Sequence, residues 1–424
     1  MKLLHVIGSM NPIMGGVCQA VRTMIAGLEE FGIHNEVTSL DAPDSRFSTE
    51  DSFQIHALGP GKSSWGYSPL LFSWLTENLV RFDVVICHGL WLYPGFALTK
   101  ALYISNKRHF IGKQEINNLP KLFIMPHGML DPYFQKAPGR KLKALRNWAY
   151  WKLIEGRNVN EADGILYTCR EEHVLAAQSF RPYSPKREII VGLGVEEPPP
   201  YTTLMQDAFL EKCPEVKDSP YILFISRIHE KKGINLLLNA FKILVNKRSE
   251  DENESTCVKL LTSEMIQKKS IYTKIPKLII AGPGLETTYG KYLQQIVSES
   301  PELHDLVFFP GMLLGNEKWG AFYGSEAFIL PSHQENFGIA VVEALACSKP
   351  VLISNQVNIW REIQSSGGGI IGDNSIKGTS KLLESWLLLS FEERQRMARS
   401  ARRCFNTHFS IYQATVKLLN ALKN

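Results

Sequence analysis

Short apolar runs alternate along the chain with stretches in which apolar residues recur at helical spacing. In the first half, Val17, Val21, Ile25 and Leu28 predict a helix that ends at Gly32. The buried strands predicted around it are Leu3–Ile7, Asn35–Leu40, Asp83–Cys87, Lys121–Met125, Gly164–Thr168 and Glu188–Val191. Strands that alternate with helices are typical of a parallel, doubly wound sheet.

This pattern stops at Glu196-Glu-Pro-Pro-Pro200 and then resumes, which predicts a linker between two α/β domains, 1–196 and 197–404. A charged run within Ser249–Ser270 predicts a solvated insertion in the second domain. We expect residues 405–424 to form a helix that returns to the first domain. The strands predicted after the linker are Tyr221–Ser226, Lys277–Ala281, Leu306–Phe309, Ala327–Leu330 and Pro350–Ser354.

Composition adds little beyond this pattern. The chain has 424 residues and a formal charge of +5, a mild excess that suits a phosphate-bearing ligand without requiring one. The seven cysteines form no C-x-x-C pair, so we expect reduced thiols in a cytosolic protein and neither disulfides nor a zinc site. The apolar run at the amino terminus is too short for a signal peptide. No stretch of the chain approaches the roughly 20 apolar residues that are needed to span a bilayer.

The most informative segment runs from Leu330 to Ala346 and contains two glutamates, Glu335 and Glu343. Glu335 follows a predicted strand directly, and Glu343 lies in the next helix among apolar neighbours. A carboxylate in such surroundings is costly to bury unless a donor satisfies it, and the vicinal hydroxyls of a ribose are such donors. The alternative is the exposed face of an amphipathic helix.

A basic loop follows the first strand of the second domain. Arg227 offers a planar fork and Lys232 a point charge, and Gly233 opens the next helix toward the same space. Together these groups suit a diphosphate. A basic loop at the end of a strand is also a common surface feature.

Two elements of the first domain are weaker indications of a ligand-binding site. Gly15 and Gly16 lie where a loop meets a helix, and such a backbone can approach a phosphate or a sugar closely. His127-Gly128 follows a predicted strand, where a lone histidine is often structural. The chain has no G-x-G-x-x-G after its first strand, no P-loop and no D-x-D carboxylate pair. A bound diphosphate would therefore need cationic side chains and helix dipoles to neutralise it.

In combination these residues resemble glycosyltransferase family 4, retaining enzymes of the GT-B architecture with two facing Rossmann-like domains. The E-x7-E pattern is present as Glu335 and Glu343, the R-x4-K-G pattern as Arg227, Lys232 and Gly233, and the Gly-Gly and His-Gly elements also match. Two positions depart from the family pattern: Leu193-Gly-Val195 replaces Asn-Gly-Val, and Ser348 replaces a glycine.

The resemblance implies a role for each matched residue. Arg227, Lys232 and the loop of Gly15 and Gly16 would bind the donor diphosphate, and Glu343 would bind the ribose. Glu335 would face the donor sugar, with His127 at its reacting face. The implied reaction moves a hexose, with retention and without a metal or other cofactor, from a nucleoside-diphosphate sugar to the hydroxyl of a sugar or a lipid-linked acceptor. The implied setting is surface-polysaccharide or glycolipid assembly, with no nucleic acid involved.

Other functions fit the same architecture. A nucleotide-sugar epimerase and a phosphorylase stay open, as does a non-catalytic nucleotide-sugar-binding protein. We also expect the stretch 139–157 to form a helix whose residues Leu142, Leu145, Ala149 and Leu153 pack on the first sheet. Its cations and aromatic residues would then suit the inner face of an anionic membrane, although a buried aromatic face is the alternative.

Overall fold

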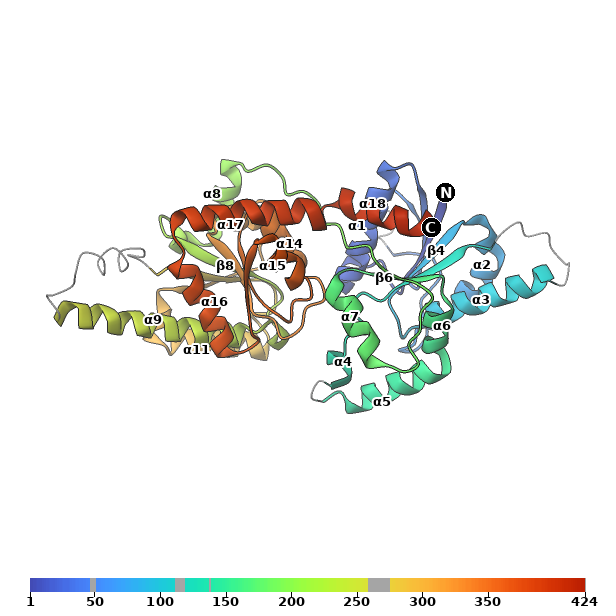
Figure 1. Cartoon of the computed structure of the whole chain (residues 1–424), viewed down its shortest axis with the longest axis horizontal. Coiled ribbons are helices and arrows are strands. Elements are labelled where there is room, and N and C mark those ends of the chain that lie inside the picture. Colours follow the sequence, from blue (N-terminus) through green and yellow to red (C-terminus); the bar gives the residue numbers. More distant parts are fainter. Residues whose placement is uncertain (46–50, 111–118, 137–138, 258–274, 424) are drawn as a thin grey trace. The chain divides into compact units, whose positions relative to one another are not determined.

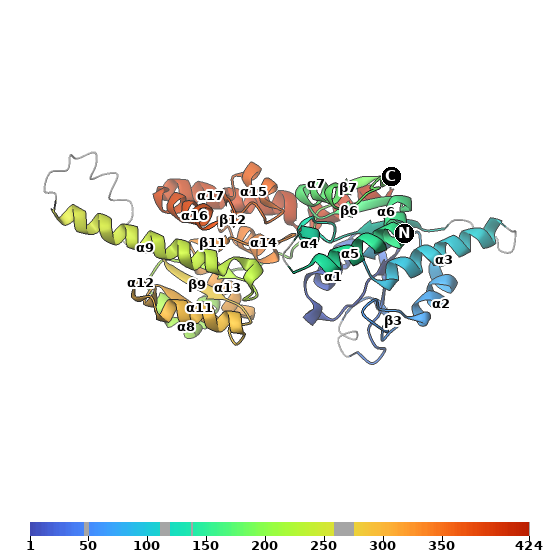
Figure 2. The same cartoon turned by 90° about the horizontal axis from the view of Figure 1, so that it is seen from below.

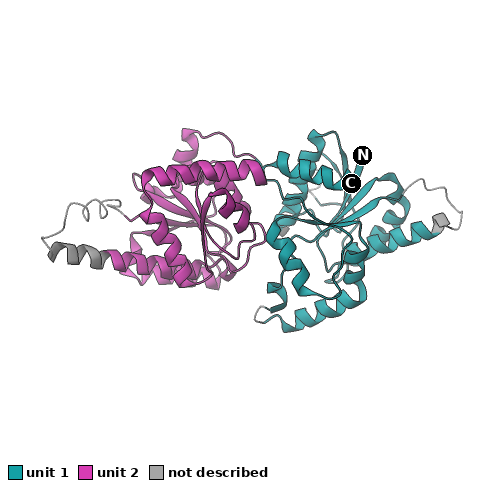
Figure 3. Cartoon of the chain, in the orientation of Figure 1, with its two compact units in different colours: residues 1–196, 409–424 teal, residues 197–408 magenta. Residues whose placement is uncertain are grey.

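The computed structural model describes residues 1–45, 51–110, 119–136, 139–257 and 275–423. The chain forms two compact units, one of residues 1–196 with 409–424 and one of residues 197–408 (Figure 3). The carboxyl-terminal segment of the chain belongs to the first unit from Phe409 onward. The sequence predicts that this segment begins at residue 405, four residues earlier. Its final helix, α18, spans Ile411–Lys423.

The first unit is built on a seven-stranded sheet in the order β3-β2-β1-β4-β5-β6-β7. All six strand pairs are parallel; Leu3, for example, lies between Asn35 and Val84. The strands are β1 (Lys2–Val6), β2 (His34–Ser39), β3 (Gln54–Ala57), β4 (Val84–His88), β5 (Lys121–Met125), β6 (Gly164–Tyr167) and β7 (Glu188–Ile190).

Helices cover both faces of this sheet because successive residues of each strand point to opposite sides. Leu4 and Val85 pack against α2 (Pro69–Asn78) and α3 (Tyr93–Phe110) on one face, whereas Leu3 and Val84 pack against α1 (Gly16–Glu30) and α18 on the other. Figure 1 shows α1 and α18 side by side. The helices are α1 (Gly16–Glu30), α2 (Pro69–Asn78), α3 (Tyr93–Phe110), α4 (Tyr133–Lys136), α5 (Lys141–Tyr150), α6 (Gly156–Glu161) and α7 (Arg170–Ser179).

The second unit holds a six-stranded sheet in the order β10-β9-β8-β11-β12-β13, again with every pair parallel. The strands are β8 (Tyr221–Ile225), β9 (Lys277–Ala281), β10 (Val307–Gly311), β11 (Ala327–Leu330), β12 (Val351–Ser354) and β13 (Gly369–Gly372). The helices are α8 (Thr203–Lys212), α9 (Ile234–Cys257), α11 (Thr288–Ser298), α12 (Pro301–His304), α13 (Gly315–Gly324), α14 (Ile339–Ala346), α15 (Trp360–Ser366), α16 (Ile376–Leu388) and α17 (Phe391–Cys404) (Figures 1 and 2).

These two sheets confirm the predicted pair of parallel, doubly wound α/β domains. The sequence pattern misses β3 and β13, which are short edge strands with only partly buried side chains. Helix α9 continues to Cys257 and so includes the first part of the predicted insertion Ser249–Ser270, whose remaining residues lie outside the described part. In the described residues, no helix is long and apolar enough to cross a membrane.

The predicted packing of the stretch 139–157 is wrong. Leu142, Leu145 and Leu153 are 85%, 64% and 80% exposed and do not pack on the sheet. Trp151 is buried instead, because its ring stacks on Phe180 at 4.8 Å between centroids and covers more apolar area than a leucine. The turn Trp151–Glu155 is π-helical, which shifts the register of the buried face after α5.

Candidate functional site

Four loops meet at the carboxyl edge of the second sheet, the edge at which α/β sheets bind ligands. The loop after β8 is joined to the loop after β9 by a bond from the Ile228 N–H to the Pro283 carbonyl, 2.8 Å. The loop after β11 is joined to the first of these through His333 N–H and Lys231 O, 2.7 Å. The loop after β12 contacts it through Glu335 N–H and Gln356 O, 2.9 Å. The loops therefore hold one another in place.

Gly233 is required where two of these loops cross. It has a φ of +69°, and a Cβ atom built on it would lie 2.0 Å from the Pro331 carbonyl oxygen. Only glycine combines this conformation with this approach. The close approach brings the end of the basic loop against the segment that carries Glu335.

Lys232 and Glu335 form an ion pair between Nζ and Oε2. The side chains are 15% and 21% exposed, so the pair is partly shielded from solvent and still open to a ligand on one side. Two residues 103 positions apart in the sequence thus lie in direct contact. The structure brings together these two predicted site residues.

Glu343 lies on α14 and forms a second ion pair, with Lys318 of α13. The Nζ–Oε1 distance is 2.8 Å, and the Lys318 ammonium also lies 4.1 Å from the centre of the Trp319 ring. The neighbours Val341, Val342, Ala344 and Leu345 are buried, as the apolar surroundings of Glu343 predict. Lys318 is absent from the sequence-based site, because a lysine before a tryptophan on a helix carries no distinguishing signal.

Arg227 has no carboxylate partner among the described residues, unlike Lys232 and Lys318. It is exposed, and within the described residues the structure gives its guanidinium no hydrogen bond or ion pair. It lies on the same loop as Lys232, directly after Ser226, whose N–H donates to the Ala281 carbonyl at 3.1 Å. The loop therefore carries one lysine engaged with a carboxylate and one arginine whose charge faces solvent.

The first unit has its own group of loops at the carboxyl edge of its sheet. Gly15, with a φ of +99°, precedes the first turn of α1, and a Cβ on either Gly15 or Gly16 would meet no atom within 4 Å. The amino terminus of this 15-residue helix is thus open to an anion. A cavity of about 330 Å³ lies beside it, lined among others by Ser9, Val17 and His88.

The His127-Gly128 turn follows β5 and is held by a buried glutamate. Both residues have positive φ, +51° and +81°. The Gly128 N–H donates to Oε1 of Glu172, a residue of α7 that is 3% exposed, while the Thr168 N–H and hydroxyl donate to Oε2 at 2.7 and 2.6 Å. Glu172 therefore fixes the backbone that carries His127.

His127 is one of three histidines in a row. Its Nε2 lies 3.0 Å from Nδ1 of His88, and Nε2 of His88 lies 3.0 Å from Nδ1 of His5. Burial lowers the pKa of both His5 and His127 to about 4 and holds the pKa of His88 well below its usual value. All three rings are therefore neutral near pH 7. His5 and His88 interrupt apolar strands, a signal that the sequence carries and that our prediction did not use.

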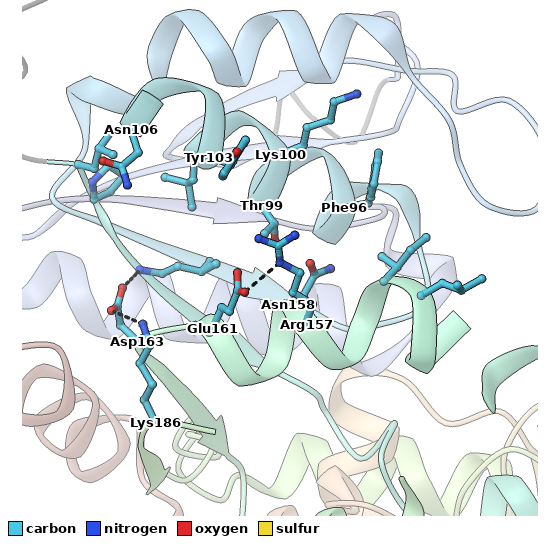
Figure 4. Close-up of a pocket in the computed structure, with 17 residues that line it drawn as sticks. Phe96, Thr99, Lys100, Tyr103, Asn106, Arg157, Asn158, Glu161, Asp163 and Lys186 are labelled. Atoms are coloured by element: carbon cyan, nitrogen blue, oxygen red, sulfur yellow. Dashed lines mark hydrogen bonds and ion pairs between the residues drawn. The ribbon is translucent and has the colours of Figure 1, made fainter. Parts of the chain in front are cut away.

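A larger cavity than the one beside α1 lies elsewhere, next to the amino-terminal ends of β5 and β6 (Figure 4). It measures about 450 Å³ and is lined by side chains that include Tyr103, Leu153 and Arg157. Arg157 and Lys186 are paired there with Glu161 at 2.9 Å and Asp163 at 3.6 Å. Because ligands of parallel sheets bind at the opposite edge, this cavity is not the functional site. Across the described ranges, no group of three His, Cys, Asp or Glu side chains is arranged to hold a metal ion.

Two family models match the chain. Residues 205–404 match the model described as glycosyl transferases group 1, and residues 15–192 match the model described as a glycosyl transferase 4-like domain. Each match falls within one of the two units, and together they include every predicted site residue.

Three curated proteins show the same likeness in part. An uncharacterized glycosyltransferase of Methanocaldococcus jannaschii is 24% identical over 40% of this chain, and the match covers 37% of that protein. A D-inositol 3-phosphate glycosyltransferase of Paenarthrobacter aurescens is 26% identical over 37% of this chain and 32% of its own length. The O-antigen chain mannosyltransferase RfbU of Salmonella typhimurium is 28% identical over 28% of this chain and 33% of its own length. The matches thus span about a third of these relatives.

Solved structures show the same fold over the whole length. The Anabaena protein HepE, in complex with UDP and glucose, superposes with a TM-score of 0.65 at 16% identity, covering 100% of this chain and 99% of its own. The lipopolysaccharide-biosynthesis glycosyltransferase WaaG superposes with a TM-score of 0.61 at 14% identity, covering 100% of both chains. With two parallel α/β units, each matched by its own family model, the chain belongs to the family 4-type glycosyltransferases of the GT-B fold.

Proposed function

We propose that this protein is a retaining hexosyltransferase that moves a sugar from a nucleoside diphosphate to a hydroxyl acceptor in surface-polysaccharide or glycolipid assembly. The proposal rests above all on the two lysine–glutamate pairs, Lys232–Glu335 and Lys318–Glu343, and on the exposed Arg227 of the loop that carries Lys232. Cations of this kind suit a diphosphate, and the carboxylates suit the hydroxyls of a ribose and of a hexose. The relatives named above as glycosyltransferases support the same reaction class.

In this mechanism Arg227 and Lys232 bind the diphosphate and stabilise the negative charge that grows on it as the glycosidic bond breaks. Glu343 accepts hydrogen bonds from the ribose, and Glu335 accepts them from the donor sugar. The open backbone at Gly15 and Gly16 allows a close approach to the amino terminus of α1, whose dipole favours an anion. The acceptor hydroxyl loses its proton to an oxygen of the leaving diphosphate, on the same face of the sugar, which retains the configuration. We assign His127 to that reacting face.

A thermal-shift screen tests this function. A nucleoside diphosphate at 100 times its dissociation constant stabilises the unit that binds it by about 2.7 kcal/mol, which raises the melting temperature of a domain of this size by about 5–10 °C. We expect such a shift with one of UDP, GDP or ADP, followed by transfer or slow hydrolysis of the matching nucleotide sugar. Both should persist in excess EDTA, because cationic side chains neutralise the diphosphate.

Three outcomes would reject the proposal. A shift without hydrolysis or transfer would indicate a binding protein, and epimerised donor an epimerase. An absorbance band from a bound pyridoxal group would indicate a phosphorylase. Activity that is lost in EDTA and restored by a divalent cation would reject metal independence alone.

We also propose that the first unit contacts an anionic membrane surface through α5 and the following turn. Leu142, Leu145, Trp148 and Leu153 are exposed, and Lys141, Lys143, Arg146 and Lys152 are exposed between them. No acidic residue occurs from 139 to 154. Exposed apolar side chains interleaved with cations suit an interface with anionic lipids, and a lipid-linked acceptor would make this contact useful.

Vesicle sedimentation tests this contact. We expect binding to vesicles that contain anionic lipid and little binding to zwitterionic ones. Reversing two cations, in Lys141→Glu with Lys143→Glu, should weaken binding by at least about thirtyfold, since each cation contributes about 1 kcal/mol. The matched control reverses Arg396 and Arg399, which are exposed on α17 of the other unit. Equal loss in both variants, or none in either, would remove this surface as the membrane contact.

A further inference from the structure

Three histidine rings connect the core of the first unit to the turn that carries His127. His5 lies on β1 and is fully buried, His88 is the last residue of β4 and is 5% exposed, and His127 follows β5. The rings lie 5.2 and 5.3 Å apart between centroids, nearly parallel at each step. Asn35 on β2 stands at the other end of this row, with its Oδ1 3.2 Å from Nε2 of His5. We refer to the hydrogen-bonded row Asn35–His5–His88–His127 as the histidine line.

Asn35 determines which nitrogen of each ring in the histidine line donates a hydrogen bond and which accepts one. Its side-chain amide Nδ2 donates to the Ile33 carbonyl at 2.9 Å, so its Oδ1 is the atom that faces His5 and accepts. A neutral imidazole has one N–H donor and one acceptor nitrogen. His5 must therefore carry its proton on Nε2, which leaves its Nδ1 as an acceptor.

The same constraint passes along the line. Because Nδ1 of His5 accepts, His88 must donate from Nε2, and its own Nδ1 then accepts from Nε2 of His127. His127 is left with a free acceptor on Nδ1, for which the described residues supply no partner. His5 and His88 are buried, and all three rings are neutral, so no second proton is present that would let the donors and acceptors exchange roles.

We propose that His5 and His88 are positioning residues that hold His127 as the neutral Nε2–H tautomer, with Nδ1 as a hydrogen-bond acceptor for a sugar hydroxyl. The identity of that hydroxyl rests on the proposed function, whereas the tautomer does not. Without the line, an imidazole in water exchanges its proton between both nitrogens, so part of the population would present a donor to the hydroxyl in place of the acceptor.

Nuclear magnetic resonance of the protein labelled with ¹⁵N-histidine tests the tautomer without any substrate. Nitrogen shifts distinguish a protonated ring nitrogen from a bare one, and the variant His127→Asn assigns the signals of His127. We expect His127 to be a single Nε2–H tautomer at pH 7. An Nδ1–H tautomer or a mixture in the unaltered protein overturns the proposal, and this measurement requires no variant to fold.

Two variants then test the role of the line. His88→Phe keeps a buried ring and removes both nitrogens, and it should turn the His127 signals into those of a tautomer mixture. His56→Phe is the matched control, because His56 of β3 bonds Glu36 at 2.7 Å outside this line, and it should leave His127 unchanged. A His127 tautomer that is unchanged in His88→Phe would overturn the proposal.

Steady-state kinetics distinguish a positioning role of His88 from a purely structural one. With the active nucleotide sugar, His88→Phe should lower kcat about tenfold and leave the KM for the donor within about twofold. A purely structural role would lower the melting temperature of His88→Phe and leave kcat of the folded fraction unchanged. If no nucleotide sugar is turned over by the unaltered protein, the proposed function fails, while the tautomer measurement still decides the positioning role.

Discussion

Replacing Arg227 with alanine is expected to lower the rate of transfer by about two to three orders of magnitude while the protein remains folded. The guanidinium is exposed and bonds no side chain among the residues described, so its loss removes no internal contact. Its charge is available to the leaving diphosphate, and removing one group that stabilises developing charge typically has an effect of about this size. Initial rates with the active nucleotide sugar, together with the melting temperature, measure both parts.

Two comparisons sharpen this test. Arg227→Lys retains the charge and loses the planar fork, so its rate should fall between those of the unaltered protein and Arg227→Ala. Arg396→Ala on α17 is the control for loss of an exposed arginine elsewhere in the same unit and should leave the rate unchanged. An Arg227→Ala protein as active as Arg396→Ala would remove Arg227 from the diphosphate site.

The fold could be predicted largely because its buried strands are continuous apolar runs. Lys121–Met125, Lys277–Ala281 and Ala327–Leu330 are central strands covered on both faces, and their sequence bounds equal their structural ones. The edge strands Gln54–Ala57 and Gly369–Gly372 are half-buried, and their polar and glycine residues hide the pattern. Periodicity also fails at α5 and the π-helical turn after it. Helical spacing predicts that Leu142, Leu145, Ala149 and Leu153 face the sheet, but Trp151 is the residue that is buried there.

The predicted site residues are those with a local signal: a charge directly after a strand or an acid within an apolar helix. Their partners have none. Lys318 pairs with Glu343 across 25 positions, and Asn35, His5 and His88 meet only because β2, β1 and β4 are neighbours in the sheet. Strand order is a property of the tertiary fold, so no spacing along the chain indicates which strand ends lie side by side.

The two glutamates should separate binding from turnover. Glu343→Gln is expected to weaken binding of the bare nucleoside diphosphate by about tenfold to a hundredfold, because hydrogen bonds to a charged acceptor contribute about 1.5–3 kcal/mol. This change also leaves Lys318 without the carboxylate that holds its ammonium at 2.8 Å. Isothermal titration calorimetry with the nucleoside diphosphate identified by thermal shift measures the effect.

Glu335→Gln is expected to spare binding of the bare nucleoside diphosphate and to lower turnover of the full donor. The carboxylate contacts Lys232, so its loss frees an ammonium for the diphosphate, and affinity for the bare nucleoside diphosphate should stay equal or rise. Turnover of the full donor should nevertheless fall by about tenfold to a hundredfold, because the sugar loses a charged acceptor. Glu392→Gln, at an exposed position at the start of α17, is the control and should change neither quantity. Weaker nucleotide binding in Glu335→Gln, with normal binding in Glu343→Gln, would reverse the assignment of the two residues, because the lost hydrogen bonds to the ribose are what should weaken binding of a ligand that carries no sugar to transfer.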